Sequence, residues 1–125
     1  MIMLGVGACG SGSDGEGGGS TTIVAAFYPL AYAAEQIGGP QVDVMNLTPP
    51  GTEPHDVELS ARDVERVRSA DFVFYIGSGF QPALEDALDG SQAAAVDLLE
   101  GLPLREAADE EGDLDVDPHV WLDPL

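Results

Sequence analysis

The sequence contains no lysine and only four arginines among its 125 residues, whereas 23 residues are acidic, so its formal net charge is −19 at pH 7. Proteins that bind nucleic acid need clustered Lys and Arg side chains to neutralise the phosphates. The composition therefore argues against nucleic acid as a partner. It is compatible with cations as ligands, although a general acidic surface that maintains solubility explains the bulk charge more simply.

Cysteine and long apolar runs are also scarce. Cys9 is the single cysteine, so the chain has no intrachain disulfide framework. No apolar run reaches the roughly 18 residues of a membrane-spanning helix. Residues 5–20 are mostly glycine, serine and acid, and such a stretch buries too little apolar surface to offset its ordering entropy. We therefore interpret residues 10–21 as a flexible tether and residues 22–125 as one α/β domain.

The first nine residues are apolar and end in Val6, Gly7 and Ala8 in front of Cys9. They resemble the end of a bacterial lipoprotein signal, in which small residues precede a cysteine that becomes lipidated. No Lys or Arg precedes this short run, so we expect either an upstream start or a truncated N-terminus. The alternative is a frayed N-terminus with an incidental cysteine. Lipidation at Cys9 would place the mature protein outside the membrane.

Strand-like and helix-like segments alternate along the body of the chain. Buried or alternating apolar residues predict strands, and capping, periodicity and proline position predict the helices between them. Ser60 and Asp63 form a capping-box pattern, with Leu59 and Val64 as its hydrophobic staple. The alternation predicts an α/β fold with a parallel sheet. The expected strands are 22–26, 42–47, 71–76 and 94–98, and the expected helices are 30–37, one that begins at Ser60, and 82–88.

Both histidines of the chain occur in the same local frame, an acid and a proline followed by the histidine. The frames are Glu53-Pro54-His55 and Asp117-Pro118-His119. His55 lies in a proline-rich loop, residues 48–55, that follows the second predicted strand. Ligands of parallel α/β sheets bind outside the carboxyl ends of the strands, and this loop is at that edge.

Neutral imidazole is a good ligand for zinc, iron and manganese, and a proline before it stiffens the backbone. Nearby carboxylates can accept the second ring N–H and orient the ring. The acids available for this supporting role are Asp56, Glu58, Asp117 and Asp123. Each histidine alone is also compatible with an ordinary surface or packing role, and two ligands do not complete a tetrahedral zinc shell.

A dense acidic stretch lies between residues 105 and 117. Its simplest interpretation is a solvated loop. The functional alternative is a weak cation-collecting loop near a metal site, although without His or Cys it would hold zinc poorly by itself.

Four segments resemble, in order and spacing, the zinc and manganese substrate-binding proteins of the ZnuA/TroA-like cluster. Residues 51–64 resemble the first metal-ligand loop of that family, and residues 69–77 resemble the strand that follows it. Residues 117–124 closely resemble the second ligand motif, and residues 27–30 the opening strand and turn. The resemblance extends from about residue 23 to residue 125.

The resemblance implies two α/β lobes joined by a long rigid helix, with a metal ion held between them. This chain would be the N-terminal lobe, truncated at the start of the linking helix, with His55 and His119 as its metal ligands. The remaining ligands are expected beyond residue 125. The family also implies capture of zinc, favoured over manganese, and delivery to the permease of an ABC importer. We expect a non-enzymatic monomer, anchored by lipid to the outer face of the cytoplasmic membrane.

Two alternatives remain open at this point. One is a metal-dependent hydrolase, although the histidines have no H-E-x-x-H spacing and the chain has no G-x-S-x-G elbow. The other is a surface adhesin of the same family, because members of this family have often been labelled adhesins.

Overall fold

The computed structural model describes residues 19–107 and 114–122. Cys9, Asp123 and the acids between 109 and 113 lie outside the described residues, as does most of the predicted tether. The lipid anchor, the tether and the supporting role of Asp123 therefore stay predictions.

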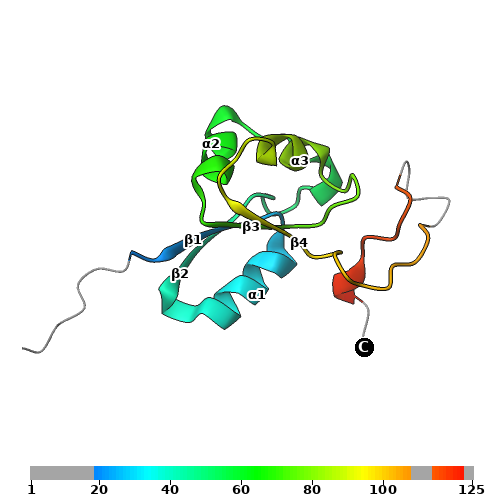
Figure 1. Ribbon diagram of the computed structural model, residues 1–125, viewed down its shortest axis with the longest axis horizontal. Helices are drawn as coiled ribbons and strands as arrows, with labels where there is room; N and C mark the ends of the chain where they lie inside the picture. Colours follow the sequence, from blue (N-terminus) through cyan, green and yellow to red (C-terminus); the bar gives the residue numbers. More distant parts are fainter. Residues whose placement is uncertain (1–18, 108–113, 123–125) are drawn as a thin grey trace, which may run out of the picture.

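Strands and helices alternate along the described chain, as the sequence predicts (Figure 1). The strands are β1 (Thr21–Ala25), β2 (Val42–Asn46), β3 (Phe72–Tyr75) and β4 (Ala94–Asp97). The α-helices are α1 (Tyr28–Gly38), α2 (Ala61–Ser69) and α3 (Pro82–Leu88), and the short 3-10 helices are η1 (Gly39–Gln41), η2 (Pro54–Asp56) and η3 (Val120–Leu122).

The four strands form one parallel sheet in the order β2-β1-β3-β4. Ile23 of β1 pairs with Val44 of β2 on one side and with Phe72 of β3 on the other. The strand order reverses between β1 and β3, because the chain adds β2 on one side of β1 and then β3 and β4 on the other. Helix α1 lies on one face of the sheet, and α2 and α3 cover the other face (Figure 1). This doubly wound arrangement confirms the predicted parallel sheet flanked by helices. Sheets of this kind bind ligands at the carboxyl ends of the strands where the strand order reverses, which here are β1 and β3.

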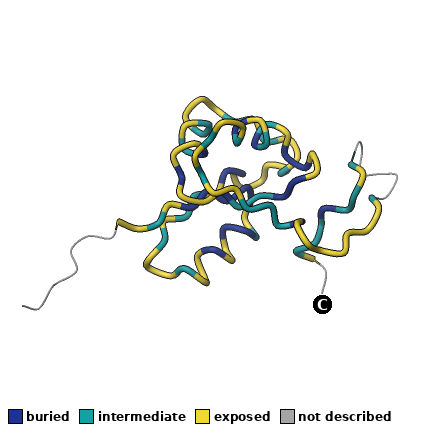
Figure 2. The backbone as a smooth tube through the Cα atoms, in the orientation of Figure 1, coloured by how far each residue is buried: buried dark blue, intermediate teal, exposed yellow. Residues whose placement is uncertain are grey.

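The core lies on both faces of the two central strands, where Figure 2 shows the buried backbone. Strands covered on both faces need apolar side chains at successive positions, and β1 and β3 provide them. Val73 and Ile76 are fully buried, and so are Val67 of α2 and Leu84 of α3. Leu30 and Ala34 bring α1 onto the opposite face.

Several element bounds differ from the sequence-based prediction by one or two residues, and two of these differences have clear local reasons. Helix α1 begins two residues early because Pro29 fits the first helical turn, where no N–H partner is required. Strand β1 begins at Thr21, inside the predicted tether, because Thr21 pairs with Val42. The proline-rich loop also runs into the single turn η2, which has Pro54 in its first turn.

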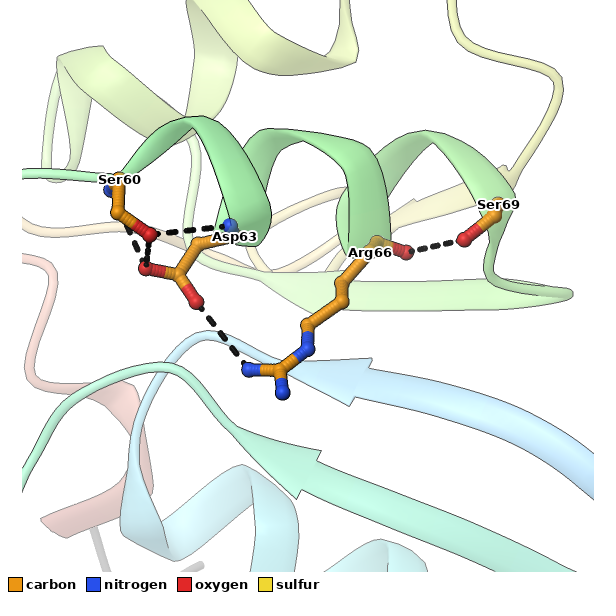
Figure 3. Close-up of polar contacts among 4 residues, drawn as sticks. All are labelled: Ser60, Asp63, Arg66 and Ser69. Atoms are coloured by element: carbon orange, nitrogen blue, oxygen red, sulfur yellow. Dashed lines mark hydrogen bonds and ion pairs between the residues drawn. The ribbon is translucent and has the colours of Figure 1, made fainter.

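The start of α2 confirms the predicted capping box (Figure 3). The Ser60 hydroxyl accepts a hydrogen bond from the Asp63 N–H at 3.2 Å, and Asp63 Oδ2 accepts one from the Ser60 N–H at 3.1 Å. Arg66 Nη1 lies 3.4 Å from Asp63 Oδ1. Leu59 and Val64, the predicted staple, are both partly buried against the core. The cap therefore fixes where the chain leaves the His55 loop and becomes helical.

A second polar contact joins the beginning of β1 to the residue before β3. Asp71 Oδ2 accepts hydrogen bonds from the Thr22 N–H at 2.8 Å and from the Thr22 hydroxyl at 2.9 Å. The backbone N–H of Thr22 is the main reason that the pKa of Asp71 lies below its ordinary value, and the Thr22 hydroxyl adds to the effect. The contact closes the amino end of the central strand pair.

We expect Ser60→Ala to lower the free energy of unfolding by about 1 kcal/mol, because the Asp63 N–H at the start of α2 loses the hydroxyl oxygen that caps it. Urea denaturation measures the difference, with Ser20→Ala, an exposed serine before β1, as the control. Equal losses in the two variants would contradict the capping role.

We expect Asp71→Asn to destabilise the protein at neutral pH and to lose this effect in acid. A carboxyl whose folded pKa is lowered stabilises the fold fully above its ordinary pKa near 3.8, and this contribution is lost as the pH falls through the folded pKa. Denaturation at a series of pH values from about 6 into the acid range tests this. The exposed Asp43→Asn on β2 serves as the control, and a pH-independent difference for Asp71→Asn would argue against the linkage.

Candidate metal site

Four segments that follow the strands converge at the carboxyl edge of the sheet. Phe27 follows β1, the loop with His55 follows β2, and Phe80 follows β3. The segment after β4 returns to this edge with His119 and Trp121. The sheet topology thus brings together two histidines that are far apart in the sequence.

The loop that carries His55 is tied to the sheet at its start. Thr48 is buried, and its hydroxyl donates a hydrogen bond of 2.7 Å to the carbonyl oxygen of Ala26. Further along, the Asp56 N–H donates to the Glu53 carbonyl oxygen at 3.1 Å and closes the η2 turn. These bonds hold the backbone on both sides of His55.

An aromatic cluster supports both imidazoles. The Phe80 ring lies 5.5 Å from Phe27 and 5.9 Å from Trp121, centroid to centroid, and Phe27 lies 4.7 Å from Trp121. His55 packs on Phe80 at 4.1 Å, and His119 packs on Trp121 at 5.2 Å. Phe80 is buried and Trp121 is partly buried against the core, so each imidazole packs on an aromatic ring that belongs to the core or borders it.

His119 has a carboxylate partner. Asp117 Oδ1 accepts a hydrogen bond of 2.9 Å from the His119 backbone N–H and lies 2.8 Å from the ring Nδ1. These contacts, the backbone bond first, hold the pKa of Asp117 below its ordinary value. A carboxylate at Nδ1 favours the tautomer with its proton there, so the lone pair is on Nε2, the nitrogen suited to bind a metal ion.

The two imidazole centroids are 6.4 Å apart, and the rings are inclined at 60°. Two imidazoles bound to one tetrahedral zinc ion would have centroids about 5 Å apart, given zinc–nitrogen distances of about 2.0–2.1 Å. The observed separation is slightly wider than that of a closed site, and a shift of roughly 1 Å would bring both rings within reach of one ion.

The other predicted supporting residues are less well placed. Asp56 and Glu58 are exposed, and no hydrogen bond between described residues joins either side chain to His55. The carboxylate beside His55 is that of Glu53, whose Oε1 lies 4.0 Å from Nε2, too far for a hydrogen bond. Within residues 19–107 and 114–122, no group of three or more His, Cys, Asp or Glu side chains could hold a metal ion. The described residues therefore contribute at most part of a ligand set.

The two described ends of the acidic stretch, residues 105–107 and 114–117, are joined by backbone pairing. Glu106 and Val116 form an antiparallel bridge, and the Asp117 N–H donates to the Arg105 carbonyl oxygen at 2.9 Å. An open cavity of about 300 Å³ lies beside this paired backbone, lined by Pro103, Leu104, Arg105, Asp117, His119, Val120 and Leu122. Asp117 and His119 thus lie at the C-terminal end of the acidic stretch, next to its paired backbone.

The sequence motifs did not mark Phe27, Phe80, Gln81 or Trp121 as residues of the site. Phe27 and Phe80 directly follow the carboxyl ends of β1 and β3, the positions at which such sheets bind ligands. That rule, applied to every strand rather than to the second alone, is the signal that would have found them. Nothing in the local sequence marks Gln81, whose contact with the His55 loop is tertiary.

One parallel α/β lobe with two histidines at its crevice is typical of a metal-binding solute-binding protein. The family model described as zinc-uptake complex component A, periplasmic, matches residues 23–125. The chain therefore belongs to the ZnuA family, which confirms the resemblance seen in the sequence motifs.

Individual relatives divide between zinc and manganese. The high-affinity zinc uptake system protein ZnuA of Bacillus subtilis is 31% identical, over 96% of this chain and 43% of the relative. The manganese-binding lipoprotein MntA of the same organism is 34% identical, over 90% of this chain and 38% of the relative. The chain thus spans less than half the length of these relatives.

The fold is also that of a solved relative. The structure of zinc-bound AdcA from Streptococcus pneumoniae superposes with a TM-score of 0.71 at 29% identity, and the match covers 82% of this chain and 22% of AdcA. The comparisons place the chain among solute-binding proteins of metal transporters, not among enzymes, in agreement with the prediction that it is not an enzyme.

We expect the neutral His119 ring to carry its proton on Nδ1, because the Asp117 carboxylate accepts it there. Long-range proton–nitrogen NMR at about pH 8 reports this tautomer. Asp117→Ala should shift the population towards a mixture of tautomers, whereas Asp115→Ala in the same segment should not. A ring protonated mainly on Nε2 in the unmodified protein would contradict the geometry.

Proposed function

We propose that this chain supplies two imidazole ligands, His55 and His119, to a divalent transition-metal ion, and that the intact protein captures this ion for an ABC importer. The observation that carries the proposal is the placement of both rings on one aromatic cluster, with centroids 6.4 Å apart. Neutral imidazoles suit zinc and other first-row metals, and the Asp117 carboxylate orients one of them.

Two imidazoles are half of a tetrahedral shell, so the remaining ligands come from outside the described residues. In the proposed mechanism, a second lobe provides these ligands and closes over a partly dehydrated cation. Closure narrows the gap between the two rings, and docking on the permease reverses it and releases the ion. The protein itself performs no covalent chemistry on its cargo.

The proposed location is outside the cytoplasm, with Cys9 lipidated and residues 10–21 as the tether to the outer face of the cytoplasmic membrane. The name of the lipoprotein MntA among the relatives supports this location. Within the described parts of the chain, no helix is long and apolar enough to cross a bilayer. The proposed working form is a monomer that docks on its permease.

Zinc is the proposed cargo in preference to manganese. A site with at least two imidazoles favours zinc, whereas manganese prefers oxygen ligands and a higher coordination number. The acidic segment beside His119 suits a divalent cation of either kind. Zinc binds most nitrogen and oxygen sites more tightly than manganese, so a higher affinity for zinc does not by itself identify the cargo. The coordination number of the bound ion distinguishes the two metals.

We expect His55→Ala and His119→Ala each to weaken metal binding by the intact protein at least about tenfold, or about 1.4 kcal/mol, because each removes one of few ligands. Competition titration against a chelator of known affinity measures the loss for zinc and for manganese.

Gln36→Ala, a substitution of an exposed side chain on α1, is the control and should keep the original affinity. Unchanged affinity in both histidine variants would refute the assignment of the ligands.

A further inference from the structure

Gln81 is a buried amide at the turn between β3 and α3, and its side chain is directed at the His55 loop. It is 3% exposed, and its Nε2 donates a hydrogen bond of 2.9 Å to the carbonyl oxygen of Pro54. Its Oε1 is buried without a hydrogen-bond partner among the described residues. Burying an amide with one atom unsatisfied costs free energy, so an apolar side chain would serve packing better at this position.

The turn that carries Gln81 is firmly held. The Gly77 N–H donates to Asp97 Oδ1 at 2.9 Å, and a Cβ at position 77 would overlap that carboxylate and displace it. The Gly79 N–H donates to Glu85 Oε1 at 2.9 Å, which ties the turn to α3. Gln81 therefore projects from a fixed base.

Two neighbouring residues of this turn contact His55, one at its side-chain ring and the other at the backbone just before it. Phe80 supports the imidazole ring at 4.1 Å, and Gln81 bonds the carbonyl group directly before the His55 backbone N–H. Pro54 and His55 belong to η2, a single turn that has little stability of its own. The β3–α3 turn thus contacts both the ring and the backbone of His55, in addition to the hydrogen bonds that the loop makes at its start and within η2.

We propose that Gln81 is a positioning residue for His55, which sets metal affinity by fixing the Pro54 carbonyl and with it the direction of the imidazole. The expected effect of Gln81 on metal binding rests on the proposed function, whereas its expected effect on the conformation of the His55 loop does not. Gln81 itself does not touch the ion.

The test is Gln81→Met in the intact protein, which keeps the length of the side chain and removes the N–H donor. We expect zinc affinity to fall about tenfold, the lower end of the losses usual for residues that support metal ligands. We also expect the absorption spectrum of the cobalt-substituted protein to change, because the geometry of one imidazole changes. In the metal-free protein, amide exchange at His55 and Asp56 should become faster.

Val73→Ala, a core substitution in β3, is the control for a purely structural effect. It should lower the melting temperature while keeping the cobalt spectrum, the zinc affinity and the exchange of the η2 turn. If Gln81→Met behaves like Val73→Ala, the positioning role is wrong while the metal site stands. If the unmodified protein binds no metal, the proposed function fails, and the exchange measurement alone then decides the positioning role: faster exchange supports it and unchanged exchange overturns it.

Discussion

The packing of Phe80 at the carboxyl edge of the sheet is the contact on which the candidate site depends. Its buried ring touches Phe27 after β1, Trp121 in η3 and the imidazole of His55. Aromatic pairs of this kind contribute roughly 0.5–1.5 kcal/mol each beyond the area that they bury. Because the three aromatic residues come from separate segments, their packing is what brings His119 near His55. The candidate metal site is in this sense an extension of the hydrophobic core, with two imidazole rings at its edge.

Local signals in the sequence were sufficient to predict the strands and helices, and the observed elements differ from the predicted ones mainly at their ends. The two central strands, β1 and β3, are apolar enough to be covered on both faces, and the capping box at Ser60 and the proline at position 82 marked where two helices begin. Boundaries moved by one or two residues where pairing or a proline decided them, as at Thr21 and Pro29. The alternation of elements was sufficient to predict a parallel sheet, since every connection crosses over through a helix.

The site was predictable only in part. The repeated acid-proline-histidine frame and the family motifs predicted His55 and His119 as ligands, and the structure brings the two rings near each other. The acid of the second frame, Asp117, lies within hydrogen-bond distance of its histidine. In the first frame the corresponding acid, Glu53, stays 4.0 Å from the ring, and Asp56 and Glu58 are exposed. The support of His55 comes instead from Phe80 and Gln81, about 25 residues further along the chain. Such contacts depend on the crossover through α2 and leave no local pattern in the sequence.

The central claim is that both histidines bind one metal ion. X-ray absorption at the metal edge of the zinc-loaded intact protein tests it most directly, because imidazole rings give a characteristic scattering pattern. The account predicts a four-coordinate ion with at least two imidazole nitrogens at about 2.0–2.1 Å, and one imidazole fewer in His55→Ala and in His119→Ala. A spectrum without imidazole scattering, or one that neither substitution changes, would contradict it.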